Sequence, residues 1–124
     1  MSRPRISIVT VDFWGTILLD GPGSDERYRA RRLNDFATIL SAAGSPMKGA
    51  DLAHAYEQSM SYLAAIWSHC RDVPVEAHVR AILNTVDSGL AARLSPDAMA
   101  KLVEAYSRPA LMVPPTVDPG ALDA

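Results

Sequence analysis

The stretch ISIVTVDFWGTILL, residues 6–19, decides how the rest of the chain is interpreted. It begins with an apolar run, reaches the acidic residue Asp12, and passes Gly15 and Thr16 before it becomes apolar again. Such a run predicts a buried parallel strand over Ile6–Val11, followed by a polar loop at the carboxyl end of the strand. Open α/β sheets bind their ligands at that end, so we expect chemistry at Asp12.

The residues around Asp12 predict a loop that can bind negative charge. An ionised carboxylate beside Val11 is costly to bury unless a cation or several hydrogen-bond donors meet it. Gly15 can adopt backbone angles that a Cβ atom forbids, so the loop can curl and direct its N–H groups at an anion. Thr16 adds a hydroxyl group. In the alternative interpretation, Asp12 only caps a turn.

The pattern of an apolar strand, Asp-x-x-Gly-Thr and an apolar residue resembles the first motif of the haloacid dehalogenase-like (HAD) hydrolase superfamily, D-x-D-G-T-[LIV]. Asp12 matches the nucleophile, Gly15 and Thr16 match the Gly-Thr pair, and Ile17 matches the apolar position. The resemblance implies an α/β fold in which a Rossmann-like core carries an inserted helical cap. It also implies that Asp12 forms a covalent aspartyl intermediate, which water then hydrolyses.

Trp14 departs from this motif, because phosphatases of the family have a second Asp there that protonates the leaving alcohol. An indole N–H is not a usable acid near neutral pH. Family branches whose leaving group needs no proton resemble D-x-Y-G-T in the dehalogenases, which expel halide, or D-W-A-G-T in the phosphonate-cleaving members. The first expectation is a phosphatase-like hydrolase acting on a small metabolite, and a 2-haloacid dehalogenase is the alternative.

The two alternatives differ in cofactor and in substrate-binding residues. For a phosphate or phosphonate, the resemblance implies Mg²⁺ bound by Asp12, the backbone carbonyl of Trp14 and acids of a later motif. For a 2-haloacid it implies no metal, and an early cap arginine holds the substrate carboxylate and the departing halide. Arg29 is our candidate for that arginine, with Trp14 as a second substrate-binding residue. A run of arginines such as that over 27–32 is more often a solvated helix face, and that interpretation stands beside the substrate-binding one.

The chain after this loop contains four amphipathic segments, which predict a four-helix bundle. Ser24 is the expected N-cap of the first helix, and Gly44 is the residue expected to end it. The other helices are expected over 50–71, from Pro74 to near Gly89, and after the N-cap Ser95. The predicted core residues are Ala30, Leu33, Phe36, Ala37, Leu40, Ala43, Leu52, Tyr56, Ser59, Leu63, Ile66, Trp67, Cys70, Val75, Val79, Ile82, Leu83, Val86, Met99, Leu102, Val103 and Tyr106.

The resemblance divides the chain into three parts. Residues 1–23 match the first strand and nucleophile loop of the core, 24–107 a four-helix cap, and 108–124 a return linker and the start of the next core helix, capped by Asp118. The segment 108–119 contains four prolines, so neither regular helix nor a central strand is expected there. The Ser or Thr, Lys and acidic pair of the later motifs have no match in the chain. We therefore expect an N-terminal fragment that is mostly helical, is inactive alone, and has one strand without a partner.

Composition limits the classes of protein to consider. The chain has 124 residues, of which 48% are hydrophobic, enough for one domain with a core. A net charge of −2 gives no basic surface for nucleic acid, and no apolar stretch approaches the ~20 residues that span a membrane. Cys70 is the only cysteine, which excludes a disulfide scaffold and a cysteine-based zinc site and favours a reducing cytoplasm. His54, His69 and His78 lack the spacing of metal ligands and are interpreted as structural.

A non-enzymatic alternative also follows from the sequence. Four helices without the later motifs form a module that binds a partner or self-associates into a homodimer, with Asp12 vestigial. The enzymatic hypothesis instead requires a small-molecule substrate. Tyr56, Met60 and Trp67 fit either hypothesis, because at helical spacing they either line a substrate pocket or pack in the bundle core.

Overall fold

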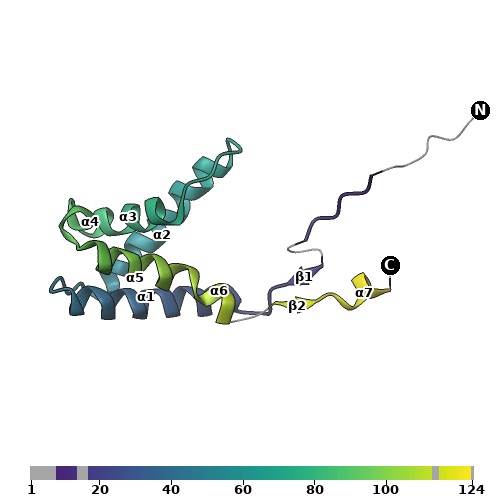
Figure 1. Cartoon of the computed structure of the whole chain (residues 1–124), viewed down its shortest axis with the longest axis horizontal. Coiled ribbons are helices and arrows are strands. Elements are labelled where there is room, and N and C mark those ends of the chain that lie inside the picture. Colours follow the sequence, from purple (N-terminus) through teal and green to yellow (C-terminus); the bar gives the residue numbers. More distant parts are fainter. Residues whose placement is uncertain (1–7, 14–16, 113–114, 124) are drawn as a thin grey trace, which may run out of the picture.

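The computed structural model describes residues 8–13, 17–112 and 115–123. Trp14, Gly15 and Thr16 of the predicted site lie outside the described residues. A helical bundle forms the main body, and the two end segments of the chain extend from the same end of this bundle (Figure 1).

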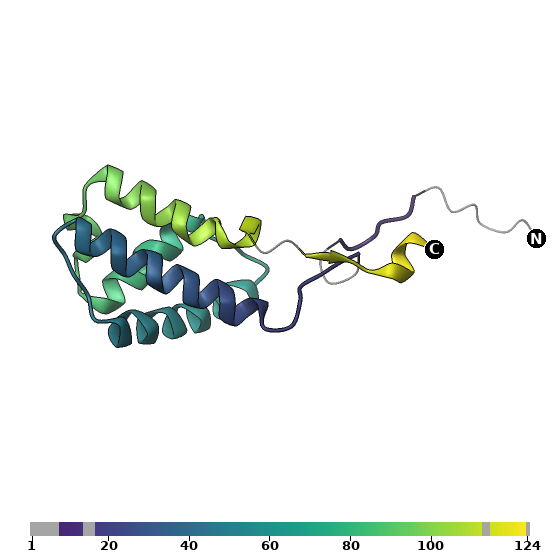
Figure 2. The same cartoon turned by 90° about the horizontal axis from the view of Figure 1, so that it is seen from below.

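Four helices of three turns or more build the bundle, and consecutive ones run in opposite directions (Figure 2). Helix α1 packs on α2 and α5, and α3 packs on the same two helices. No helix of the described part of the chain has the length and apolar character needed to cross a membrane. The helices are α1 (Ser24–Ala42), α2 (Gly49–Trp67), α3 (Val75–Val86), α4 (Leu90–Arg93), α5 (Pro96–Ser107), α6 (Pro109–Met112) and α7 (Pro119–Leu122).

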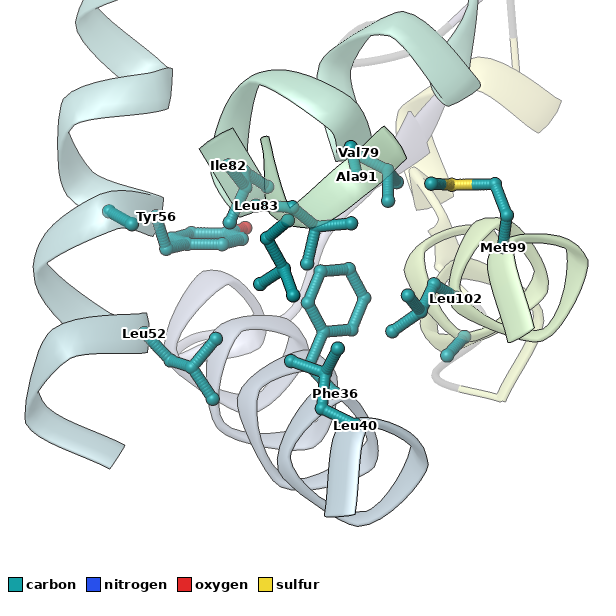
Figure 3. Packing of buried hydrophobic residues seen from close by; sticks show 13 residues of the cluster. Phe36, Leu40, Leu52, Tyr56, Val79, Ile82, Leu83, Ala91, Met99 and Leu102 are labelled. Atoms are coloured by element: carbon teal, nitrogen blue, oxygen red, sulfur yellow. The ribbon is translucent and has the colours of Figure 1, made fainter. Parts of the chain in front are cut away.

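The core of the bundle consists largely of apolar side chains that the helical spacing predicted, but Ala55, Leu90, Ala91 and Ala105 also belong to it and were not predicted. Figure 3 shows the Phe36 ring of α1 in the middle of this cluster. Each of the four long helices contributes side chains that are almost completely excluded from water, so the burial of apolar surface between the helices stabilises the bundle. The most buried members are Phe36, Leu40, Leu52, Val79, Ile82, Leu83, Leu90 and Leu102.

The periphery of the predicted core is wrong at several positions. Ala30, Ala43, Trp67, Cys70 and Val75 are exposed. Helix α2 has 19 residues but its neighbour α3 has only 12, so the last turns of α2 have less of the bundle to pack against. Trp67 is 50% exposed, and its indole N–H donates to the Asp72 carboxylate at 3.1 Å.

Two predicted helix ends are also wrong. Ser24 is the first residue of α1 and is buried, while Gly23 is the N-cap with a φ of 71° that favours glycine. Helix α2 ends at Trp67 and not at residue 71, because Cys70 has a φ of 53°. The N–H of Arg71 then donates to the carbonyl of Ile66, which closes the helix end.

Other predicted ends are confirmed. The Ser95 side chain accepts a hydrogen bond from the N–H of Ala98 at the start of α5, and Asp118 accepts one from Gly120 at the start of α7. Gly44 has a φ of 78° just after α1, as a helix-ending glycine should. Helix α3 ends at Val86, three residues before Gly89, and the single turn α4 that follows was not predicted.

The N-terminal strand is not formed in the part of it that the structure describes. Residues 8–11 have no regular secondary structure and are exposed, with Ile8 at 79%. Among the described residues, the two strands (Leu18–Leu19 and Thr116–Val117) pair with each other, so residues 8–11 have no partner strand for their backbone hydrogen bonds.

A short pair of strands forms elsewhere instead. Strand β1 (Leu18–Leu19) pairs antiparallel with β2 (Thr116–Val117), in the register Leu18 to Val117 and Leu19 to Thr116. The prediction that 108–119 contains no regular helix is wrong for the single turn α6, whereas β2 is an edge strand of a two-stranded ladder and not a central strand. Both elements are short, which is consistent with the effect of its prolines on longer helices and strands.

The complete burial of Leu102 predicts a large loss of stability when its side chain is truncated. Leu102→Ala removes a side chain that is 0% exposed and should lower the free energy of unfolding by about 2–5 kcal/mol, measured by urea denaturation. Leu111→Ala is the control, because Leu111 is 84% exposed and its loss should change stability by less than about 0.5 kcal/mol. Equal effects of the two substitutions would contradict this packing.

Candidate functional site

Asp12, the predicted nucleophile, lies six residues before β1 and twelve residues before the start of α1. It is exposed and belongs to the described segment 8–13, which has no regular secondary structure. The carbonyl of the next residue, Phe13, accepts hydrogen bonds from the N–H groups of Ile17 and Leu18, each at 2.9 Å. Phe13 is therefore held beside β1, which leads directly to α1.

A groove of about 290 Å³ lies between the first turns of α1 and the middle of α2, and we call it the α1–α2 groove. It is close to the entry of the chain into the bundle, because the Tyr28 hydroxyl in its wall donates to Asp20 at 3.4 Å. The groove contains Arg29, the predicted substrate-binding residue. Its lining residues are Asp25, Glu26, Tyr28, Arg29, Arg32, Tyr56, Glu57 and Met60.

Arg29 forms an ion pair across this groove. Its Nε donates to Oε1 of Glu57 at 2.6 Å, which joins α1 to α2, and both side chains are largely exposed. The charge of Arg29 is thus matched by a carboxylate of the bundle itself. A role of Arg29 in substrate binding stays a prediction, and it requires a ligand to compete with Glu57.

Arg32 is the cation of this groove that is most firmly held. Its Nε donates to the backbone carbonyl of Tyr106 at 2.7 Å, and its Nη1 donates to the Tyr56 hydroxyl at 2.9 Å. The guanidinium also lies 4.0 Å from the centre of the Tyr106 ring and 5.9 Å from that of Tyr28. Within the described ranges, Arg32 has no carboxylate at ion-pair distance.

Arg32 was not among the predicted site residues, because it is one of several arginines over 27–32. One sequence signal distinguishes it. Arg32 precedes Phe36 and Leu40 by four and eight residues, so it lies on the buried face of α1, whereas Arg31 points elsewhere and pairs with Asp35.

His78 extends this polar cluster into the bundle. It is 3% exposed, and its Nε2 lies 2.9 Å from Oγ of Ser59. The Ser59 hydroxyl donates to the carbonyl of Tyr56 at 2.6 Å, so its oxygen is left to accept a hydrogen bond from Nε2–H of His78. The imidazole also packs edge-on against Tyr106, with 4.8 Å between ring centres. The contacts thus form a closed ring through Arg32, Tyr56, Ser59, His78 and Tyr106.

The electrostatics of this ring make His78 and Tyr106 poor proton-transfer groups near neutral pH. Burial, and secondly the positive charge of Arg32, lowers the pKa of His78 from 6.5 to about 4. Burial raises the pKa of Tyr106 to about 12, despite the opposing effect of Arg32. Both side chains are therefore neutral at pH 7. His78 acts as a structural residue, as the sequence had indicated.

The described residues do not fit a metal site. No group of three or more His, Cys, Asp or Glu side chains in residues 8–13, 17–112 and 115–123 is arranged to hold an ion. Magnesium requires several oxygen ligands in near-octahedral geometry, and Asp12 supplies only one carboxylate. The backbone carbonyl of Trp14, the second predicted ligand, lies outside the described residues. We derive no chemical step through a metal.

The structure brings some of the predicted site residues together. Arg29 shares the α1–α2 groove with Tyr56 and Met60, which were considered for a substrate pocket. Trp67, the third such residue, lies outside this groove near the end of α2. Comparison of the chain with protein-family models, with curated proteins and with solved structures finds no match.

The neutral state of His78 predicts a loss of stability in acid. The unfolded residue titrates near pH 6.5 and the folded one near 4, so only the unfolded state gains a proton between these values. The free energy of unfolding should fall by up to about 3 kcal/mol as the pH decreases from 6.5 to 4. Denaturation of the wild type at a series of pH values measures this loss.

Two variants identify His78 as the source of that loss. His78→Gln has no titrating ring, so its stability should change less between pH 6.5 and 4 than that of the wild type. His54→Gln is the control, because His54 is exposed on α2 and contacts Gln58 of the same helix. An unchanged pH dependence in His78→Gln would contradict the assignment.

Proposed function

We propose that the chain provides the nucleophile and the cap of a HAD-like hydrolase, with Asp12 as the nucleophile and the four-helix bundle as the cap. In this proposal residues 1–23 and 108–124 belong to an α/β core and 24–107 to the cap. The substrate is a small metabolite, and phosphatase-like hydrolysis is the first choice of reaction. The proposal includes a cytoplasmic location, which the exposed Cys70 favours because an exposed thiol stays reduced there.

One observation carries this proposal: the segments that enter and leave the bundle are paired. Leu18 lies opposite Val117 in the β1–β2 ladder, and the N–H of Asp118 donates to the carbonyl of Ile17 at 2.8 Å. A domain inserted into a loop of another domain must begin and end at neighbouring points. The β1–β2 pair has this property, and the motif with Asp12 immediately precedes it.

The α1–α2 groove supports the same proposal from the side of the substrate. It follows β1 by a few residues and contains two arginines, Arg29 and Arg32. Arginines in a groove suit an anionic substrate, because their positive charge offsets the negative charge of the substrate. In the dehalogenase alternative, the same groove holds the carboxylate of a 2-haloacid.

The proposed reaction has two steps. An Asp12 carboxylate oxygen forms a bond to phosphorus or carbon, and the bond to the leaving group breaks with its electron pair. Water then cleaves the aspartyl intermediate and restores the carboxylate. The N–H and hydroxyl groups of Gly15 and Thr16 are assigned to the developing negative charge. Trp14 donates no proton, so in the phosphatase-like reaction another group or water protonates the leaving alcohol, whereas the halide of the dehalogenase alternative needs no proton.

A helical interaction module is the second candidate, and one observation favours it. The side chains of Ile8, Val9, Val11 and Phe13 are between 57% and 79% exposed. Four large apolar side chains within six residues form a segment that other protein surfaces tend to cover. In this candidate the segment associates with a partner or with a second copy of the chain, and Asp12 has no catalytic role.

The test uses the native protein isolated from its source and a panel of phosphate monoesters, phosphonates and 2-haloacids. Hydrolysis by the wild type should be lost, by at least about 10³-fold, in Asp12→Asn, which keeps the shape of the side chain but is a poor nucleophile. Asp123→Asn is the matched control, because Asp123 is also exposed but lies outside the motif. Equal activity of Asp12→Asn and wild type would contradict the proposal.

Turnover in H₂¹⁸O separates the alternatives within the proposal. Water attacks the phosphorus of an aspartyl phosphate, so the label should appear in inorganic phosphate. Water attacks the carbonyl carbon of an aspartyl alkyl ester, so with a 2-haloacid the label should enter the Asp12 carboxylate. Peptide mass spectrometry after a single turnover measures this. Absence of activity on every substrate class would favour the interaction module.

A further inference from the structure

We propose that the α1–α2 groove binds a small zwitterion, a molecule with a carboxylate at one end and an ammonium group at the other. Arg32 binds the carboxylate in this proposal, and Asp25 binds the ammonium group. The inference goes beyond the proposed function, because it concerns ligand binding by the bundle and does not need Asp12 to be a nucleophile.

The Arg32 end of the groove is suited to a carboxylate. Arg32 is half-buried and fixed by Tyr56 and Tyr106, yet these partners use only Nε and one N–H of Nη1. Among the described residues, Nη2 has no hydrogen-bond partner. A guanidinium with free N–H groups binds a planar carboxylate through paired hydrogen bonds. Because its orientation is already fixed, little conformational entropy is lost when it binds.

The Asp25 end of the groove carries the opposite charge. Asp25 lies in the first turn of α1 and lines the groove, and in the described part of the chain it forms no ion pair. Burial and Asp20 raise the pKa of Tyr28, and Asp25 adds to this effect, so its carboxylate lies near the groove wall. Asp25 and Arg32 are seven residues apart and therefore lie on the same face of α1.

The middle of the groove is close to neutral. Arg29 and Glu57 neutralise each other there through their ion pair. The groove as a whole is lined by three acidic and two basic side chains, so a ligand with charges of both signs gains more there than a simple anion does. A zwitterion gains from both ends. The apolar surfaces of Tyr28, Tyr56 and Met60 can contact the methylene groups between its charges.

The spacing of the two charged residues limits the length of the ligand. Seven residues of α-helix correspond to about 10 Å along its axis. For charged groups separated by the same distance as these backbone positions, a charge-assisted hydrogen bond of about 2.8 Å at each end leaves roughly 5 Å between the two charged groups of a ligand. The α-amino and carboxyl groups of glycine are too close together to satisfy this. A linear molecule such as 5-aminopentanoate is long enough.

The experiment is an NMR titration of the full 124-residue chain with four probes: 5-aminopentanoate, pentanoate, pentylamine and glycine. An exposed ion pair changes a binding constant by up to about fivefold, so 5-aminopentanoate should bind about threefold to fivefold more tightly than pentanoate or pentylamine. Glycine should be the weakest ligand. The largest shifts should occur at Tyr28, Arg32, Tyr56 and Met60.

Two variants test whether Asp25 binds the ammonium group of the ligand and Arg32 its carboxylate. Asp25→Asn should remove the preference for 5-aminopentanoate over pentanoate, and Arg32→Gln should remove its preference over pentylamine. Asp97→Asn is the matched control for the first, because Asp97 is an exposed acid in the first turn of α5. Arg31→Gln is the control for the second, because Arg31 lies outside the groove. Circular dichroism checks that each variant is folded. If Arg32→Gln does not fold, the titration of Asp25→Asn tests the proposal.

Three results would overturn the inference. They are equal affinity for 5-aminopentanoate and pentanoate, shifts centred outside the α1–α2 groove, and an unchanged preference in Asp25→Asn. Because the measurement is binding and not turnover, such a failure leaves the role proposed for Asp12 untouched. Likewise, full activity of Asp12→Asn would contradict the proposed function but would not affect the binding result.

Discussion

The even number of long helices is the constraint on which the arrangement of this chain depends. Each helix of an antiparallel bundle reverses the direction of the chain, so four of them return it to the end at which it entered. Helix α1 begins and α5 ends there, and the short strands β1 and β2 then lie side by side (Figure 1). A ladder of two residues per strand is weak by itself. The packing around Phe36 and Leu102 is what holds its strands together.

The same packing shapes the polar end of the bundle. Arg32 lies on the buried face of α1 and is therefore placed between the helices. There the Tyr56 hydroxyl and the Tyr106 carbonyl accept its hydrogen bonds, and its guanidinium packs on the Tyr106 ring. A half-buried cation in turn disfavours a second positive charge nearby, which contributes to the neutral state of His78. Helix packing thus creates both a fixed guanidinium in a groove and a residue that destabilises the bundle in acid. The ring of side chains that includes Arg32 and His78 therefore affects both the acid stability of the bundle and the ligand binding that we propose.

Local patterns predicted the parts of the structure that depend on local interactions. The apolar spacing identified Phe36, Leu40, Leu83 and Leu102, because the face of a helix that is buried follows directly from its period. Tertiary contacts were beyond such reasoning. Arg32 bonds to residues 24 and 74 positions away, and the β1–β2 ladder is too short to show a pattern of alternation. For the candidate site, the sequence placed Arg29 in a charged helix face but gave no sign that Glu57 would bind it.

The central claim is that the bundle begins and ends at one point, immediately after the Asp12 motif. NMR measurements on the β1–β2 ladder test it most directly. The account predicts cross-strand nuclear Overhauser effects between Leu19 and Thr116, and slowed hydrogen exchange at the N–H of Asp118, which donates to the carbonyl of Ile17. A folded bundle without these signals would contradict the claim, because the entering and leaving segments would then be independent.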